Sequence, residues 1–150
     1  MTDIPRPALL LGLAGVLPFG WGVLTMQIDA LSHFTLAFAG SRFIGPSVQL
    51  FYGAVILSFM SGVLWEFSTN SKGKFSIVGY SLSVLPALWA FFSVGDRPEQ
   101  TGQNLIIGFL GLLVIDWFFW SRSFTPIWWM KLRIFLTFLV IPLLAVGVYL

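Results

Sequence analysis

The sequence predicts an all-α integral membrane protein, a single domain built as a bundle of about five transmembrane helices. Hydrophobic residues make up 57% of the 150 residues and charged residues only 9%, against roughly 25% charged residues in an average soluble domain. Five long apolar runs recur along the chain, each close to the roughly 20 residues that cross a hydrocarbon core. A water-soluble fold of this size could not bury so much apolar surface, so the lipid bilayer is the expected partner.

Residues 7–27 form the first expected span and carry no charge. Pro7 suits an early helical position, where its missing N–H costs nothing. Gly12 and Gly15 would let a neighbouring helix approach closely, and Pro18 should kink the helix near its middle. We expect a retained helix rather than a cleaved signal peptide, because the A-x-A pattern Ala37-Phe38-Ala39 lies too far beyond the apolar run and Pro18 interrupts that run.

Residues 28–46 are expected to form a short helix lying along the membrane surface. Asp29, His33 and Arg42 divide this segment into apolar stretches too short to span a bilayer. His33 is the only histidine and the chain has no cysteine. A metal ligand would lack partners, so we expect a solvated or hydrogen-bonded histidine, no metal site and no cofactor.

Residues 47–67 form the second expected span. Ala54, Ser58 and Gly62 recur every four residues and make a stripe of small side chains suited to close helix packing. Glu66 continues this row by one turn, so it should point toward protein. Two interpretations of Glu66 stay open: a solvated charge at the helix end, or an intramembrane acid with a proton or ion role.

The later spans are separated by short polar connections. Thr125 followed by Pro126 is a helix-start signal, an N-cap residue before an N1 proline. Residues 95–103 contain the densest polar stretch and are interpreted as a solvated turn. The remaining three spans are residues 75–94, 104–120 and 126–149.

The distribution of basic residues predicts the orientation. With five spans, six lysines and arginines fall on one side of the membrane and two on the other, which places the N-terminus in the cytoplasm and the C-terminus outside. The bases are scattered, so a nucleic-acid partner is not expected. The six are Arg6, Lys72, Lys74, Arg122, Lys131 and Arg133, and the two are Arg42 and Arg97.

Charged residues at one membrane face supply the candidate site. Asp116 near the end of the fourth span and Arg133 near the start of the fifth lie at similar depths. An unpaired arginine there would be costly, so we expect a salt bridge that fastens the two helices. Lys131 can reach the headgroups on its long stem, and Glu66 is the other acid at this face. A proton relay is the alternative role for the same residues.

The motifs of common enzymes are missing. The sequence has no P-loop, no G-x-G-x-x-G, no G-x-S-x-G elbow and no H-E-x-x-H. Haem ligation between spans would want paired histidines, and an intramembrane protease would need a nucleophile with its base or paired acids at depth. We therefore expect a protein without enzymatic activity.

Several local motifs of the chain form a recognisable set. They are Leu11-Gly12-Leu13-Ala14-Gly15, Pro18-Phe19, Tyr52-Gly53-Ala54-Val55-Ile56-Leu57-Ser58-Phe59 with Gly62 and Trp65, Asp116, and Pro126-x-Trp128-Trp129-x-x-Leu132-Arg133-x-x-Leu136-Thr137. Together they resemble the transmembrane protein 69 family, a group of unknown function found in bacteria and, as mitochondrial proteins, in animals. The resemblance implies a small multi-pass protein of the bacterial inner (cytoplasmic) membrane with no established activity. Here Leu64-Trp65-Glu66 replaces the family's frequent His-Trp-small sequence, which favours Asp116 with Arg133 as the shared feature.

Two functions remain open at this point. The first is an accessory, assembly or stabilising component of a larger membrane complex, which the small size and glycine-rich helix faces favour. The second is a small oligomeric transporter or channel that uses the acids near the cytoplasmic face. A solute pathway should carry polar residues through the midplane, where this chain has mainly serines and apolar side chains. The first is therefore the preferred hypothesis. Besides the lipid bilayer, the partners that the sequence leaves open are other membrane subunits or a second copy of the chain.

Overall fold

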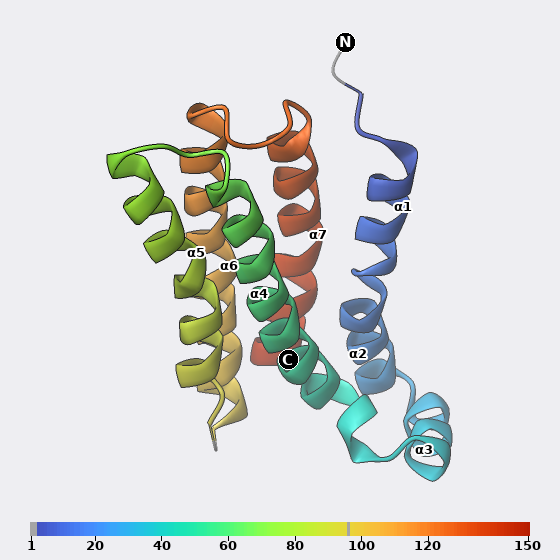
Figure 1. Cartoon of the computed structure of the whole chain (residues 1–150). Helices are drawn as coiled ribbons and strands as arrows, with labels where there is room; N and C mark the ends of the chain where they lie inside the picture. The colour runs from blue at the N-terminus through green and yellow to red at the C-terminus, as the bar shows by residue number, and fades with distance from the viewer. Residues whose placement is uncertain (1–2, 96) are drawn as a thin grey trace.

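The computed structural model describes residues 3–95 and 97–150, and these residues contain helices and no strand. Five helical segments in the described part are long and apolar enough to cross a membrane, which confirms the predicted fold class (Figure 1). The helices are α1 (Arg6–Ala14), α2 (Leu17–Gln27), α3 (Asp29–Phe38), the 3-10 helix η1 (Ser41–Phe43), α4 (Gly45–Ser68), α5 (Lys74–Ser93), α6 (Pro98–Ser121) and α7 (Trp129–Tyr149).

The first span is divided into two helices rather than kinked within one. Proline at position 18 has no N–H to donate to the carbonyl of Ala14, so one hydrogen bond of the helical ladder is missing there. The chain turns at residues 15–16, and the Phe19 N–H donates to the Val16 carbonyl at 3.1 Å as α2 begins. Pro86 and Pro142, in contrast, lie inside the continuous helices α5 and α7.

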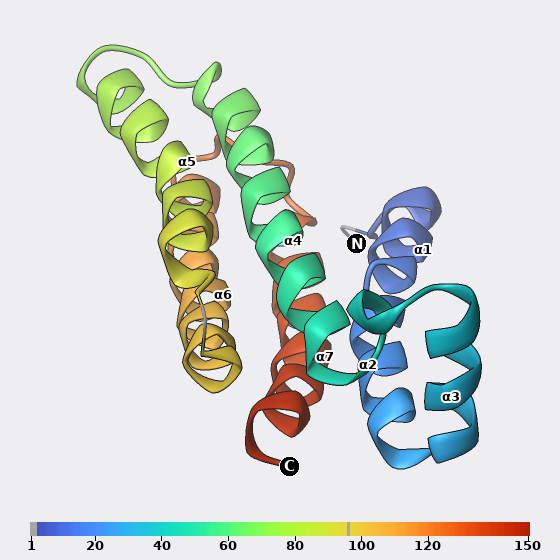
Figure 2. The same ribbon diagram turned by 90° about the horizontal axis from the view of Figure 1, so that it is seen from below.

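After α2 the chain forms α3 and η1 before it enters α4. Figure 2 shows α3 beside the end of α2. Two side chains of α2 hold the returning chain: the Thr25 hydroxyl accepts the Gly45 N–H at 2.8 Å, and the Trp21 indole N–H donates to the Phe43 carbonyl at 3.1 Å. His33 is exposed on α3. That α3 lies along the membrane surface stays a prediction.

The start of the fourth span differs from the sequence-based boundary. Residues 98–103, expected in a turn, form the first part of α6. Pro98 occupies an early helical position and Glu99 lies in the first turn, where a carboxylate favours the helix dipole. The Thr101 hydroxyl accepts the Gly95 N–H at 3.3 Å and closes the connection to α5. Hydropathy does not detect a polar first turn, so the helix begins six residues earlier than the apolar pattern predicts.

The start of the fifth span also differs. The expected N-cap Thr125 directs its hydroxyl at the Pro126 carbonyl at 3.3 Å instead of at a backbone N–H. The Trp129 N–H donates to the Pro126 carbonyl at 3.0 Å, so this segment forms a turn before α7 begins at Trp129. The Thr125–Pro126 start signal was therefore wrong by three residues, because the chain uses it for a turn that leads into the helix.

Helix α4 occupies the centre of the bundle and packs against α2, α5, α6 and α7 (Figure 1). Its buried apolar side chains meet those of α2, α5, α6 and α7 in one core. The core thus joins the first span to the last three. The largest fully buried apolar side chains are Phe19, Leu57, Leu64, Leu105, Leu112, Phe119 and Leu144.

The face of α4 that packs against the other helices is not the row of small residues that the sequence predicts. Ser58 and Gly62 are exposed, and Ala54 is only half-buried. The buried row runs instead through Gly53, Leu57 and Ser61 and onward to Leu64 and Ser68. Both rows offer small residues, and a shift of one position turns the helix by about 100°. The neighbouring helices, rather than the pattern along α4, decide which row faces inward.

Gly12 and Gly15 lie where helices approach one another. A Cβ atom added at Gly12 would lie 2.9 Å from a methyl group of Leu136 on α7. One added at Gly15 would lie 3.7 Å from the Tyr52 hydroxyl on α4. Gly12 thus provides the closer of the two contacts, between the first and last spans.

Ser61 makes a polar contact between α4 and α5. Its hydroxyl accepts the Ala87 backbone N–H at 2.8 Å, next to Pro86 in α5. Ser58, one turn earlier and exposed, donates to the Ala54 carbonyl of its own helix at 2.9 Å. Ser61 therefore joins two helices, whereas Ser58 bonds only within α4, which makes Ser58 a control for Ser61.

We expect Ser61→Ala to lower the free energy of unfolding by roughly 0.6–1.7 kcal/mol, the value of an interhelical hydrogen bond in a membrane. Ser58→Ala should change it less, because its bond lies within one helix. Equilibrium unfolding of both variants in bicelles provides the comparison. Equal losses in the two variants would contradict the role of Ser61.

Candidate functional site

Asp116 and Arg133 meet between α6 and α7. Asp116 lies five residues before the end of α6 and is fully buried, and Arg133 lies four residues after the start of α7. The Arg133 Nε donates to Asp116 Oδ2 at 2.7 Å. Opposite charges at this distance in a medium of low polarity attract strongly, whereas either charge alone would be costly to bury. The ion pair fastens the last two spans together.

Trp129 supplies the second donor to the carboxylate. Its indole N–H donates to Asp116 Oδ1 at 2.9 Å, so each carboxylate oxygen accepts a hydrogen bond. The indole ring also packs edge-on against Phe67 of α4, with ring centroids 4.9 Å apart. This ring contact links the Asp116–Arg133 pair, which lies between α6 and α7, to the central helix α4. We call Asp116, Arg133, Trp129 and Phe67 the ion-pair junction.

The Arg133 guanidinium keeps unused donor capacity. Its Nη2 atom is buried and has no hydrogen-bond partner among the described residues. A buried unpaired donor costs free energy, and charged donors bind carboxylates and phosphates with particular strength. The Asp116–Arg133 pair can therefore hold two helices together. Its free Nη2 donor could in addition bind a small hydrogen-bond acceptor.

The loops near the ion-pair junction are tied to one another. Asn70 of the α4–α5 loop donates from Nδ2 to the Phe124 carbonyl of the α6–α7 loop at 3.0 Å. The Trp120 indole N–H donates to the Ile127 carbonyl at 3.2 Å. Glu66 and Lys131 lie at exposed positions of α4 and α7. The structure thus brings Asp116 and Arg133 together and leaves Glu66 outside their junction.

Gln49 forms a second polar junction, which the sequence analysis missed. The side chain is fully buried in α4, and its Nε2 donates to the Phe19 carbonyl of α2 at 2.8 Å and to the Leu143 carbonyl of α7 at 2.9 Å. One amide group therefore joins three helices. The signal in the sequence was a lone uncharged amide within the apolar run 47–67.

Two glycines make room for Gln49. A Cβ atom added at Gly22 of α2 would lie 2.5 Å from Gln49 Cγ and 2.9 Å from the Gly45 carbonyl oxygen. A Cβ atom added at Gly147 of α7 would overlap Gln49 Oε1. The backbones of α2 and α7 come this close only without side chains. We call Gln49 with Gly22 and Gly147 the glutamine junction.

Metal binding finds no support among the described residues. In residues 3–95 and 97–150, no three His, Cys, Asp or Glu side chains gather closely enough to hold an ion. The candidate site therefore consists of the two polar junctions. Their chemistry is hydrogen bonding and charge pairing.

The ion-pair junction predicts coupled effects of substitution. We expect Asp116→Asn and Arg133→Gln each to lower the free energy of unfolding by about 3–5 kcal/mol. The first leaves the buried Arg133 cation without its carboxylate, and the second leaves the buried Asp116 carboxylate without its cation. The double variant should lose less than the sum, by about 1–3 kcal/mol. Unfolding of all four proteins in bicelles gives the double-mutant cycle. Glu66→Gln is the control, an exposed acid that should show no measurable change. Additive losses would mean that the two side chains do not interact.

The glutamine junction predicts a difference between two glycines of α2. Gly22→Ala should lower the free energy of unfolding by about 1–3 kcal/mol, since the added methyl group overlaps both Gln49 and a backbone oxygen. Gly20→Ala is the matched control, because nothing lies within 4 Å of a Cβ atom added there. It should stay within about 0.5 kcal/mol of the parent protein. The same unfolding measurement tests both, and a neutral Gly22→Ala would contradict the junction.

Comparison with known proteins assigns the family. A family described as "Protein of unknown function (DUF3429)" matches residues 4–149. Transmembrane protein 69 of Xenopus tropicalis is 34% identical over 140 residues, 91% of this chain and 51% of the relative, and that of Mus musculus is 32% identical over 138 residues, 89% of this chain and 52% of the relative. The chain thus spans about half the length of these curated relatives. No solved structure matches. The chain belongs to the DUF3429 family and is a multi-pass membrane protein similar to transmembrane protein 69.

Proposed function

We propose that the protein is a non-enzymatic membrane component that assembles with or stabilises other membrane subunits through the outer face of α4. The observation that carries this proposal is the row Ala54, Ser58 and Gly62. Ser58 and Gly62 are exposed, and nothing lies within 4 Å of a Cβ atom added at Gly62. In lipid, small residues on a helix face permit close packing of another helix. The inner face of α4 is already occupied, so the outer face is available to a partner.

The use of the buried polar groups also supports this proposal. Asp116 is held by two donors, and Gln49 uses both amide hydrogens to join helices. Groups engaged in this way are poorly suited to bind and release a solute, because each release would leave a buried polar atom unpaired. They are well suited to keep a small bundle rigid while a partner docks on its exterior.

The proposed setting is the bacterial inner membrane, with the N-terminus in the cytoplasm. The bonded α4–α5 and α6–α7 loops lie at one end of the bundle and carry Lys72 and Arg122 (Figure 1). Arg42 and Arg97 lie at the other end, before α4 and α6. The excess of basic residues at the first end supports its cytoplasmic position.

The test is purification of the tagged protein from its native membrane in a mild detergent, followed by native mass analysis. We expect co-migration with a stoichiometric partner, and loss of that partner in Gly62→Leu, whose side chain would occupy the outer face of α4. Gly111→Leu is the matched control, because Gly111 is also an exposed helical glycine with nothing within 4 Å of an added Cβ atom. It should keep the partner. Equal behaviour of both variants would contradict the α4 face.

Transport is the second candidate function, and the buried Nη2 of Arg133 favours it, because that atom has no partner among the described residues. An anion or a water molecule on a pathway could bind there transiently. A lone monomer or homo-oligomer in the native mass analysis would exclude the assembly proposal. Solute flux in liposomes, abolished by Asp116→Asn with folding retained, would then establish transport.

A further inference from the structure

The structure has an apolar groove between its first two spans. The groove has a volume of about 1020 Å³ and is lined mainly by side chains of α2 and α4, with contributions from Leu13 of α1 and Leu143 of α7. This volume lies at the upper end of the roughly 300–1,000 Å³ typical of ligand pockets. Its walls belong to two segments long and apolar enough to cross a membrane. The medium beside the groove is therefore lipid hydrocarbon.

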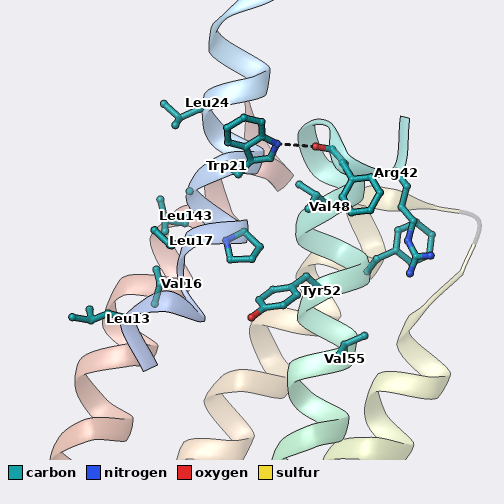
Figure 3. A pocket seen from close by; sticks show the side chains of 14 residues that line it. Leu13, Val16, Leu17, Trp21, Leu24, Arg42, Val48, Tyr52, Val55 and Leu143 are labelled. Atoms are coloured by element: carbon teal, nitrogen blue, oxygen red, sulfur yellow. Dashed lines mark hydrogen bonds between the residues drawn. The ribbon is translucent and has the colours of Figure 1, made fainter. Parts of the chain in front are cut away.

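The groove is open to that medium along its length. Leu17 of α2 is 70% exposed and Val55 of α4 is 57% exposed, although both line the groove. Helix α2 packs against α4, whereas α1, before the break at residues 15–16, diverges from α4 (Figure 1). The lining reaches Leu13 of α1 (Figure 3). No described segment of the chain fills this space. A flexible hydrocarbon chain has the shape and polarity to do so.

One end of the groove is charged. Arg42 is the only charged residue in its lining, and it precedes α4, a helix long and apolar enough to cross a membrane, by three residues. A cation at the end of such a helix suits the headgroup region. Figure 3 shows Arg42 and Trp21 near one end, with Leu13 and Val55 toward the other. The Trp21–Phe43 hydrogen bond fixes η1, and with it Arg42, against α2. The cation is thus held beside the apolar groove rather than on a loose loop.

Arg42 remains able to bind an anion. Within residues 3–95 and 97–150 it forms no ion pair, and its guanidinium lies over the Phe51 ring with the Cζ atom 4.8 Å from the centroid. A contact of this kind with a ring does not neutralise the charge, and guanidinium N–H groups fit the oxygens of a phosphate.

We propose that this groove is a binding site for one anionic phospholipid, with an acyl chain along α2 and α4 and the headgroup phosphate on Arg42. Val55 lies about 15 Å beyond the start of α4 at the standard helical rise. An acyl chain in the groove would therefore run from the headgroup level toward the middle of the bilayer. Charge complementarity at Arg42 selects the headgroup, and the apolar walls receive the chain.

The first test compares headgroups and charges. Purified protein is titrated with phosphatidylglycerol or phosphatidylcholine and the bound lipid is counted by native mass spectrometry. We expect one phosphatidylglycerol per chain, bound more tightly than phosphatidylcholine, and an affinity lowered roughly fivefold in Arg42→Gln. Arg97→Gln is the matched control, since Arg97 is an exposed arginine at the same end of the bundle outside the groove. Equal losses in the two variants, or no headgroup preference, would overturn the proposal.

The second test fills the groove. Val55→Trp should reduce the occupancy of either lipid, because the indole ring would take the space of the acyl chain. Val114→Trp is the control on α6, where valine is 66% exposed and outside the groove, and it should leave the occupancy unchanged. Unaltered lipid binding in Val55→Trp, or a second protein copy occupying the groove in place of lipid, would also overturn the proposal. Should Val55→Trp fail to fold, the Arg42→Gln and Arg97→Gln pair decides the outcome.

Discussion

The hydrocarbon core offers no water to a buried carboxylate, and the arrangement of the last two spans follows from how Asp116 meets this constraint. A charged acid at that position must find donors within the protein. Arg133 and Trp129 supply them from one helical turn of α7, so the position and rotation of α7 relative to α6 are fixed by two hydrogen bonds to one carboxylate. Phe67 then holds the Trp129 ring from α4. One charge thereby organises three helices at one end of the bundle.

The other end of the bundle buries the uncharged amide of Gln49, whose Oε1 atom has no hydrogen-bond partner among the described residues. Gln49 gives both amide hydrogens to backbone carbonyls of other helices, which is possible only because Gly22 and Gly147 let three backbones converge on it. The energetic contribution of each such bond is modest in membranes, but its geometry is specific. Together the two junctions specify how the helices are rotated, a property that apolar packing against lipid leaves weakly determined.

The sequence predicted the five spans and the pairing of Asp116 with Arg133, because long apolar runs are unambiguous and few charges were available to pair at that depth. It did not predict Gln49, since an uncharged amide has many ways to satisfy its donors. It also placed the packing face of α4 on the row of Ser58 instead of that of Ser61. Small residues occur on both rows, and the choice depends on neighbours such as the Ala87 N–H of α5. Helix starts at Pro98 and Trp129 were missed because local polarity and turn signals do not distinguish a polar first turn from a loop.

The Gln49–Leu143 hydrogen bond connects residues 94 positions apart in the chain. In a protein whose helices enter the membrane in the order of synthesis, Gln49 reaches the bilayer with α4, and its acceptor on α7 arrives only after α5 and α6 have been inserted. During that interval one amide hydrogen has to be satisfied elsewhere, by water or by the translocation machinery. The nascent bundle therefore carries an amide hydrogen without its final acceptor between the first two spans, and completion of the last span supplies that acceptor.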